Sequence, residues 1–385
     1  MKKIFICFII LMMCGCNHVS DRMPKGVTLS LKNKELEVYK EYSIKDIIDS
    51  NVEISDSIID TNSIGSKDLD IYYIYKNKKY VYHTTYEVID TVKPKIFGGS
   101  NKTVTVGSNI DLCSLVMYGD NYDSQPICTV VGEYDLNTIG KYNIKLEVYD
   151  MSGNMNNHSI TLNVIEKSDN KNNNHSNNNT SKLAFADAYS KYKDNYQLGI
   201  DVSEWQGIVD YEKVRAAGAT FVMMRIGVNT KSGIKVDGQY LNNIKAAKEA
   251  GLKVGVYLYS IAKSKAEAIE EAKWVIDLLN KEELDLPIVF DWEIWNGWNT
   301  YHMSFHDLNE MAKAFIKTVE DNGYQGMIYG SKFYLENFWD GTYSNVWLAH
   351  YTSNTTYQGY KIWQFSNIGR IDGINGDVDL DVMLP

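Results

Sequence analysis

The sequence lacks the features by which several common classes of protein are recognised. It has no basic stripe, since 39 Lys and Arg residues stand against 49 Asp and Glu residues and the formal net charge is −10. Clustered positive charge is what binds a phosphate backbone, so nucleic acid is excluded as an expected partner. The seven histidines are scattered and form no Cys/His cluster. We therefore expect neither a metal site nor a cofactor.

Cysteine is scarce, and beyond the first 16 residues only Cys113 and Cys128 remain. Both fall in one candidate domain. In an oxidising compartment they form either a single disulfide bridge or two free, partly buried thiols. The sequence leaves these two alternatives open.

The N-terminal apolar run is too short to span a bilayer comfortably. It covers residues 4–13 behind two lysines, which is the pattern of a secretory signal. The Cys14-Gly15-Cys16 that follows resembles the lipobox of bacterial lipoproteins, in which the cysteine is acylated. That resemblance implies lipidation at Cys16 and attachment to a membrane through the lipid. Plain secretion and an uncleaved anchor are the alternatives, and in each case the mature chain lies outside the cytoplasm.

Residues 166–182 are polar throughout and contain no apolar residue. Such a stretch buries too little surface to offset its ordering entropy, so a flexible linker is predicted. Tryptophan usage changes across it, because all eight Trp residues lie at or beyond Trp205. The predicted organisation is a signal with its lipidation site at 1–16, β-rich modules at 17–92 and 93–165, an Asn-rich linker at 166–182 and a large domain at 183–385.

The part before the linker is predicted to be all-β and duplicated. Asp60-Thr-Asn-Ser-Ile-Gly65 recurs as Asp135-Leu-Asn-Thr-Ile-Gly140, and an alternating strand-like run follows each copy. Short strands with turn signals between them, repeated at this length, are typical of small β-sandwiches. Both modules resemble the bacterial immunoglobulin-like repeats of wall-associated proteins, the second more closely than the first. Such modules are most often spacers, and specific ligand binding is the alternative.

Strand and helix alternate through the large domain. Its strands are rich in β-branched residues, which indicates a parallel (β/α) barrel of the TIM type, and after residue 351 the helices fade, which indicates an irregular closure. Two helical patterns open with capping-box spacings, a full match at Ser264 with Glu267 and a weaker one at Ser304 with Asp307. The expected strands are 198–202, 221–226, 253–260, 286–293, 327–330, 346–351 and 360–365, and the expected helices include 240–250, 264–280 and 304–322.

Two carboxyl groups end one of the apolar strands. Asp291 and Glu293 lie two positions apart at the end of residues 286–293, so their side chains face the same way. Reactive groups of such barrels lie at the carboxyl ends of the strands. The candidates that this rule brings to one rim are Asp201, Arg225, Tyr257, Tyr259, Asp291, Glu293, Tyr329, Trp347, Tyr351 and Gln364.

Several acids among aromatic residues are typical of a site that hydrolyses sugars. The reaction needs a protonated carboxyl group for the leaving oxygen and a second group that stabilises an oxocarbenium-like transition state. Glu293 is the predicted acid because its side chain is the longer one, and desolvation by Trp292, Trp295 and Trp298 is expected to raise its pKa. Asp291 is its charged partner. Three roles are open to Asp291: it acts as the nucleophile, it orients a substrate acetamido group that attacks in its place, or it holds a water molecule. The sequence does not distinguish among them.

Seven blocks follow one another through the large domain. They are Gly199-Ile-Asp-Val-Ser-Glu-Trp-Gln-Gly207, Phe221-Val-Met-Met-Arg-Ile-Gly227, Gly255-Val-Tyr257, Asp291-Trp-Glu293, Trp347-Leu-Ala-His-Tyr351, Trp363-Gln364 and Gly373-Ile-Asn-Gly-Asp-Val-Asp379. Together they resemble the glycoside hydrolase family 25 muramidases over about residues 197–385. The resemblance implies a distorted barrel that cleaves the β-1,4 bond between N-acetylmuramic acid and N-acetylglucosamine in peptidoglycan. It implies catalytic roles for Asp201, Asp291, Glu293 and Asp379, and the other rim residues are expected to bind substrate.

One departure from the family pattern lies in the last acidic run. Asp381 stands where Asn is common in the family, and alternation is expected to place Asp377, Asp379 and Asp381 on one face. The choice of Asp379 as the site residue therefore rests on the resemblance.

Three other functions fit parts of the pattern. They are an inactive peptidoglycan-binding protein, a different glycosidase such as a chitinase-like enzyme, and an adhesion or scaffold protein. The four retained acids disfavour the first and the ordered blocks disfavour the second. Remodelling of the cell's own wall, opening it for an envelope-spanning machine and attack on competitors all need the same bond cut, and a lipid anchor favours action on the producer's own wall.

Overall fold

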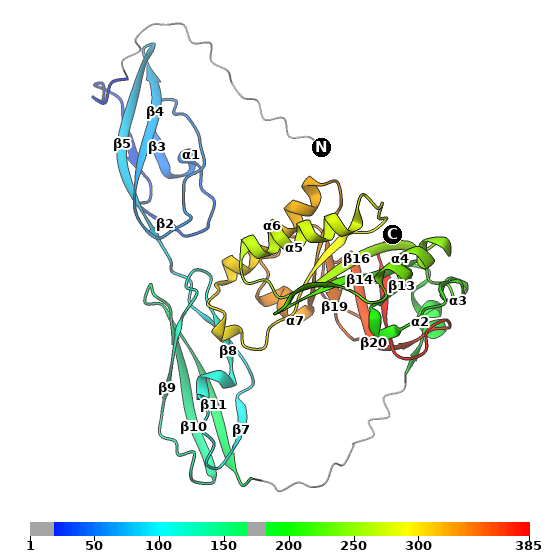
Figure 1. Ribbon diagram of the computed structural model, residues 1–385. Coiled ribbons are helices and arrows are strands. Elements are labelled where there is room, and N and C mark those ends of the chain that lie inside the picture. The colour runs from blue at the N-terminus through cyan, green and yellow to red at the C-terminus, as the bar shows by residue number, and fades with distance from the viewer. Residues whose placement is uncertain (1–18, 168–181) are drawn as a thin grey trace. The chain divides into compact units, whose positions relative to one another are not determined.

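The computed structural model describes residues 19–167 and 182–385 (Figure 1). The predicted signal, the lipidation site Cys16 and residues 168–181 of the predicted linker lie outside these ranges. Two compact units divide the chain, Met1–Val92 and Lys93–Pro385. Among the described residues, no helix combines the length and the apolar character that crossing a membrane requires.

A long antiparallel hairpin organises the first unit. Lys76 and Asn77 form its two-residue turn, with φ values of 47° and 60°, as a turn that matches the twist of paired strands requires. Burial alternates along the first arm, where Ile71 and Tyr73 are buried and their neighbours are exposed. The elements are β1 (Leu29–Leu31), β2 (Glu35–Glu37), α1 (Ile44–Ile47), β3 (Ile48–Ser50), β4 (Gly65–Tyr75) and β5 (Lys78–Ile89).

The second unit begins with residues 93–165, here called the β module. Its main sheet has the order β7-β11-β10-β9, and β6 and β8 pair separately. A disulfide bridge joins Cys113 to Cys128, which decides between the two alternatives that the sequence left open. The elements are β6 (Lys95–Phe97), β7 (Asn101–Thr105), the 3₁₀ helix η1 (Leu112–Leu115), β8 (Met117–Gly119), β9 (Ile127–Val131), β10 (Gly140–Tyr149) and β11 (Met155–Ile165).

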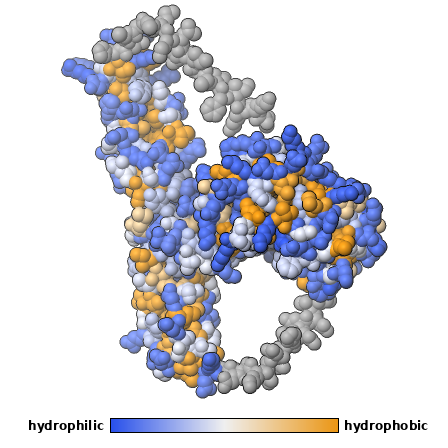
Figure 2. Space-filling model, in the orientation of Figure 1, coloured by the Kyte–Doolittle hydropathy of each residue, from blue (hydrophilic) through white to orange (hydrophobic). Residues whose placement is uncertain are grey.

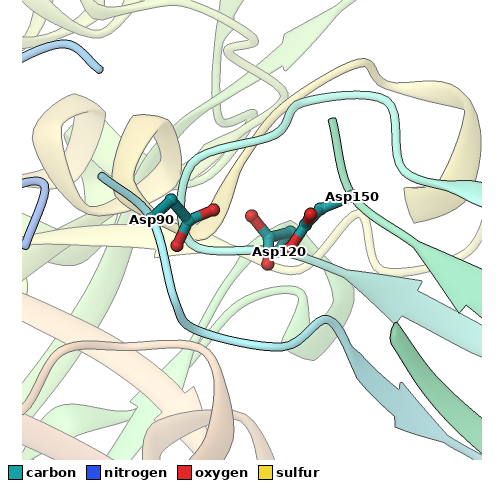
Figure 3. A group of neighbouring side chains, drawn as sticks. All are labelled: Asp90, Asp120 and Asp150. Atoms are coloured by element: carbon teal, nitrogen blue, oxygen red, sulfur yellow. The ribbon is translucent and has the colours of Figure 1, made fainter. Parts of the chain in front are cut away.

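Acidic side chains shape the loops at one end of the β module. Carboxylate oxygens of Asp120 and Asp150 lie within 4.8 Å of one another (Figure 3). Asp120 accepts two backbone N–H groups of its own loop, and Asp150 accepts the backbone and side-chain N–H groups of Asn154. Asp90, labelled in the same figure, belongs to the first unit, where it accepts the backbone N–H of Val92. These carboxylates hold the backbone turns that carry them.

Some apolar side chains remain on the surface of the β module. Ile127 and Val131 are exposed on β9, the edge strand of the main sheet, and Figure 2 shows orange, apolar patches over this part of the chain. Scattered apolar residues are normal on a protein surface and indicate no function by themselves.

Residues 197–383 close into a barrel, which confirms the fold predicted for this part. Seven parallel strands follow the order β13-β14-β16-β17-β18-β19-β20, and β21 completes the ring by pairing antiparallel with both β20 and β13. The expected irregular closure is this antiparallel last strand. The strands are β13 (Gln197–Val202), β14 (Phe221–Thr230), β16 (Lys253–Ser260), β17 (Ile288–Trp292), β18 (Gly326–Ser331), β19 (Val346–Ala349), β20 (Ile362–Arg370) and β21 (Val378–Met383), with β12 (Leu183–Ala184) and β15 (Gly233–Val236) pairing at the margin.

Helices follow the strands as the sequence pattern indicates. α6 buries Leu308, Met311 and Phe315, whose spacing places them on one helix face. The helices are α2 (Phe185–Tyr192), α3 (Tyr211–Ala216), α4 (Tyr240–Glu249), α5 (Lys265–Leu279), α6 (Phe305–Asp321) and α7 (Lys332–Asn337), with the 3₁₀ turns η2 (Glu204–Gln206) and η3 (Trp298–Thr300).

The two expected helix caps form, but their relative quality is the reverse of the prediction. Ser304 and Asp307 make a complete, reciprocal capping box at α6. Ser264 accepts the backbone N–H of Glu267 at α5, yet the Glu267 carboxylate binds the N–H of Lys263 instead of that of Ser264. The longer glutamate side chain reaches one residue beyond the cap, whereas aspartate reaches the cap itself.

Candidate active site

A hollow of about 240 Å³, here called the acidic pocket, lies at the carboxyl ends of the barrel strands. Each of the eight strands that close the ring contributes at least one side chain to it. Every predicted site residue except Tyr351 lines it, and the Tyr351 hydroxyl reaches it by donating to Gln364 at 3.0 Å. The lining residues are Asp201, Ser203, Trp205, Gln206, Arg225, Tyr257, Tyr259, Asp291, Glu293, Tyr329, Trp347, Gln364 and Asp379.

Asp291 lies in β17 and is only 6% exposed. Its Oδ1 is buried and has no hydrogen-bond partner among the described residues. Burial raises the pKa of Asp291 well above its ordinary range, the charges of Glu293 and Asp201 raise it further, and Arg225 opposes them. Buried polar atoms are normally hydrogen-bonded, so this oxygen is a candidate acceptor for a donor group of a ligand.

Glu293 follows the end of β17 and opens onto the acidic pocket. Its side chain meets solvent at the mouth of the pocket, while protein atoms displace water from its other sides and raise its pKa. Two adjacent carboxyl groups with raised pKa values retain a proton at a pH where isolated carboxyl groups have lost theirs. The strand end thus offers a proton donor beside a second carboxyl group.

The tryptophans expected to desolvate Glu293 pack behind the strand end instead. Trp292 is fully buried, and its indole Nε1 donates to the carbonyl of Ala262 at 2.8 Å. Alternation along the strand turns Trp292 away from the two acids that flank it. None of the three lines the acidic pocket, whose aromatic walls are Trp205, Tyr257, Tyr259, Tyr329 and Trp347.

Gln364 joins the tyrosine side of the pocket to the aspartate side. Its Oε1 accepts the hydroxyl groups of Tyr329 at 2.9 Å and Tyr351 at 3.0 Å. Its Nε2 donates to Asp201 at 2.8 Å and to Asp379 at 3.4 Å. Because every polar atom of the amide is engaged, Gln364 fixes the orientation of two acids and two phenols.

The last acidic run occupies three different environments. Asp377 precedes β21 and forms ion pairs with Lys182 and Arg370 at the surface. Asp379 lines the acidic pocket. Asp381 is fully buried, and its Oδ1 accepts the indole N–H of Trp347 at 2.8 Å. The expectation that all three share one face is wrong for Asp377, because the strand that would impose the alternation begins only after it.

A second group of carboxyl groups with raised pKa values surrounds Asp201. Burial raises the pKa of Asp201 well above its ordinary range, and the charge of Asp381 adds to this. Burial also raises the pKa of Asp379 to about 9, with repulsion from Asp201 as the next cause, and that of Asp381 to about 7. Like charges this close cannot all ionise. This side of the pocket therefore carries protons as well as negative charge.

Arg225 supplies positive charge at the pocket. Its Nε donates to Asp237 at 2.8 Å and its Nη2 donates to Glu204 at 2.9 Å. A planar guanidinium group that makes two hydrogen bonds to carboxylates is held in a fixed orientation. The fixed charge favours the ionised form of Asp291.

Three lining residues are absent from the predicted site. Ser203, Trp205 and Gln206 lie on the turn after β13, where Ser203 and Gln206 form a reciprocal capping box. The Trp205 side chain is 80% exposed at the edge of a polar pocket. The sequence pattern that predicts them is the Ser-x-x-Gln spacing of a capping box, which directly follows a strand with an acidic residue at its end.

Paired carboxyl groups at one strand end of a parallel barrel, with aromatic walls, are the arrangement that glycoside hydrolysis requires. The glycosyl hydrolases family 25 matches residues 200–374 of this chain. The chain belongs to that family and is a glycoside hydrolase.

Individual relatives and solved structures match about half of the chain. YegX, an uncharacterised protein of Escherichia coli O157:H7, is 30% identical over 193 residues, which are 48% of this chain and 68% of that protein. The autolytic lysozyme of Clostridium acetobutylicum is 27% identical over 191 residues, 48% of this chain and 54% of its own length. Among solved structures, a family 25 glycosyl hydrolase from Bacillus anthracis is 18% identical with a TM-score of 0.43, covering 49% of this chain and 89% of that one.

Proposed function

We propose that the chain is a muramidase that hydrolyses the β-1,4 bond between N-acetylmuramic acid and N-acetylglucosamine in peptidoglycan. The observation that carries the proposal is the pair at the end of β17, in which Glu293 opens onto the pocket and Asp291 keeps a buried oxygen unpaired. Family membership supports the reaction class. Relatives named autolytic lysozyme and lysozyme M1, the latter from Streptomyces globisporus, support the substrate.

In the proposed reaction Glu293 donates its proton to the glycosidic oxygen while the bond between that oxygen and the sugar carbon breaks. The leaving sugar departs as an alcohol, and the bond electrons go to its oxygen. Asp291 faces the positive charge that develops on the other sugar, and Arg225 favours the ionised form of Asp291. Water finally supplies the hydroxyl group of the new reducing end and returns a proton to Glu293.

Three steps are open to Asp291, and the product configuration separates them. Direct attack by water that Asp291 holds gives an inverted sugar. Attack by Asp291 itself, or by a substrate acetamido oxygen that Asp291 orients, gives a retained one. Proton NMR of the freshly released reducing end distinguishes inversion from retention.

We also propose that the enzyme works at the cell surface. A lipid on Cys16, immunoglobulin-like modules at 17–92 and 93–165 and a flexible stretch at 166–182 would connect the membrane to the barrel at 183–385. The chain is acidic, so electrostatic attraction does not hold it to anionic wall polymers. A lipid anchor supplies the local concentration that charge does not, and favours action on the producer's own wall.

Mass spectrometry of purified peptidoglycan digested by the protein tests the proposed function. Products with reducing N-acetylmuramic acid ends are expected. Reducing N-acetylglucosamine ends would replace the muramidase by a glucosaminidase, and soluble fragments from chitin alone would replace it by a chitinase-like enzyme. Binding to peptidoglycan without any product would contradict catalysis altogether.

A further inference from the structure

The β module contacts the loop that follows Glu293. This loop, residues 294–304, connects β17 to α6, and β8 lies beside it (Figure 1). Asn299 makes two hydrogen bonds to the backbone at the start of β8: its Oδ1 accepts the N–H of Tyr118 at 3.0 Å, and its Nδ2 donates to the carbonyl of Val116, the residue before β8, at 2.9 Å. A side-chain amide that binds an N–H and a C=O of one strand takes the place of a rung in a β-ladder.

Two aromatic residues extend the contact on either side of Asn299. The indole Nε1 of Trp298 donates to the carbonyl of Tyr118 at 3.0 Å, and the backbone N–H of Phe305 donates to the carbonyl of Asp120 at 2.8 Å. Gly119 makes this closeness possible. A Cβ atom there would lie 2.8 Å from Trp298 Nε1 and 2.9 Å from the Phe305 ring, so the two surfaces fit each other only without a side chain at this position.

A second, mostly apolar contact joins β6 to the barrel. The ring of Phe97 packs on that of Phe338 with 4.8 Å between centroids. Lys95 donates to the carbonyl of Asn337 at 3.0 Å, and its ammonium group lies 5.5 Å from the centre of the Phe305 ring. The β module is thus packed against the barrel at two places, in addition to being joined to it through the chain.

The contact continues toward the acidic pocket through backbone hydrogen bonds. Trp298 donates its backbone N–H to the carbonyl of Trp295 at 3.1 Å, and Trp295 donates to the carbonyl of Glu293 at 2.8 Å. The Trp295 ring stacks on Tyr334 with 3.8 Å between centroids. A continuous series of bonds therefore leads from β8 to the backbone of Glu293.

We propose that the β module is a clamp on the active-site loop. By fixing residues 294–304 it holds Glu293 where the proton transfer requires it, a role beyond that of a spacer. Asn299 is then a positioning residue, because it contacts β8 and acts through the loop. The inference rests on the proposed function of Glu293, since a displacement of about 1 Å in a reacting group costs as much as 10²-fold in rate.

A pair of glycine variants in the full chain tests the clamp. Gly119→Ala places a methyl group against Trp298 and Phe305, whereas a Cβ on Gly99, in the same module, meets nothing within 4 Å. Gly119→Ala is expected to lower kcat on peptidoglycan by about tenfold or more with KM within about twofold, because the reacting group moves while the sugar-binding walls stay. Gly99→Ala is expected to behave as the unmodified protein.

The pH profile separates positioning from a general loss of folded protein. A loosened loop admits water to Glu293, so its pKa falls and the basic limb of kcat/KM moves to lower pH, by about half a unit. Asn299→Ala is expected to reproduce both effects without adding bulk. Unchanged kcat and pH profile in Gly119→Ala and Asn299→Ala would overturn the clamp, and so would equal losses in Gly119→Ala and Gly99→Ala.

Hydrogen–deuterium exchange measures how firmly residues 294–304 are held, and it does so without relying on catalysis. Residues 294–304 are expected to exchange faster in Gly119→Ala and Asn299→Ala than in the unmodified chain, and equally in Gly99→Ala. If the unmodified protein cleaves no peptidoglycan, the proposed function fails while this exchange difference still tests the clamp. No change in exchange would overturn the clamp even in a fully active enzyme.

Discussion

At the residue scale, the acidic pocket is organised by what burial does to carboxyl groups. Asp291 and Glu293 share a strand end and a raised pKa, but Asp291 is buried while Glu293 opens onto the pocket. Gln364 ties the second group of acids to two phenols. The site therefore contains a proton donor, Glu293, that a substrate can reach, together with buried carboxyl groups that are held in place by packing and hydrogen bonds.

Replacing Glu293 by Gln keeps the shape of the side chain but removes its proton. If Glu293 protonates the leaving oxygen, Glu293→Gln is expected to lower kcat by more than about 10²-fold. Release of reducing ends from purified peptidoglycan measures this, with thermal unfolding as the control for folding. Near-normal turnover by the variant would contradict the assignment of the acid.

Asp379 is expected to destabilise the fold as pH rises. Its folded-state pKa of about 9 exceeds its unfolded value, so its contribution to stability is complete below the unfolded pKa and is lost as pH rises through the folded one. Asp379→Asn is therefore expected to raise the free energy of unfolding by roughly 1 kcal/mol at pH 8 and to leave it nearly unchanged at pH 4.

Asp377 provides the matched control in the same acidic run. Its hydrogen bond and ion pairs lower its pKa, so Asp377→Asn is expected to change stability in the opposite direction at neutral pH. Denaturant unfolding at the two pH values measures both variants. Equal effects of the two substitutions would contradict the burial argument for Asp379.

At the element scale, the strands were predictable and the details of their ends were not. β16 begins and ends where the sequence predicts a strand, at Lys253 and Ser260. The helix caps were found at the expected serines, but Glu267 reaches past its cap while Asp307 closes a complete box. Sequence spacing identifies which residues are close, whereas side-chain length in the folded backbone decides which atoms meet.

The cap of α6 is expected to matter more than that of α5. The Ser304 hydroxyl accepts the backbone N–H of Asp307, and the Asp307 carboxylate accepts the backbone N–H of Ser304. Ser304 also lies beside the contact between the β module and the barrel. Ser304→Ala is expected to cost roughly 1 kcal/mol, and Ser264→Ala less, because only the first breaks a reciprocal pair. Chemical denaturation compares the two, and a larger loss for Ser264→Ala would contradict the order.

At the scale of the whole molecule, the division of the chain carries a functional consequence. Residues 93–165 pack with the barrel in one compact unit, and residues up to 92 form the other. A polar stretch in the sequence predicts a linker, but the packing between segments decides where one compact unit ends and the next begins. The β module thus belongs to the same compact unit as the barrel, although the predicted linker separates them in sequence.

Attachment to the membrane is tested on the intact chain. Cys16→Ser removes the acceptor of the proposed lipid and is expected to release the protein from the membrane fraction, because the buried acyl chains would supply the membrane affinity. Fractionation and immunoblotting of producing cells measure this. Continued membrane association of Cys16→Ser would contradict lipidation at Cys16.

The sequence by itself determined the barrel, its strand order along the chain and the set of side chains at the strand ends, because a two-residue period and strand direction are local properties. Only the tertiary structure decided how those side chains differ. It turned three tryptophans away from Glu293, separated Asp377 from Asp379, engaged every atom of the Gln364 amide and brought β8 against the loop after Glu293. These outcomes depend on burial and on contacts between residues far apart in the chain, which no local pattern contains.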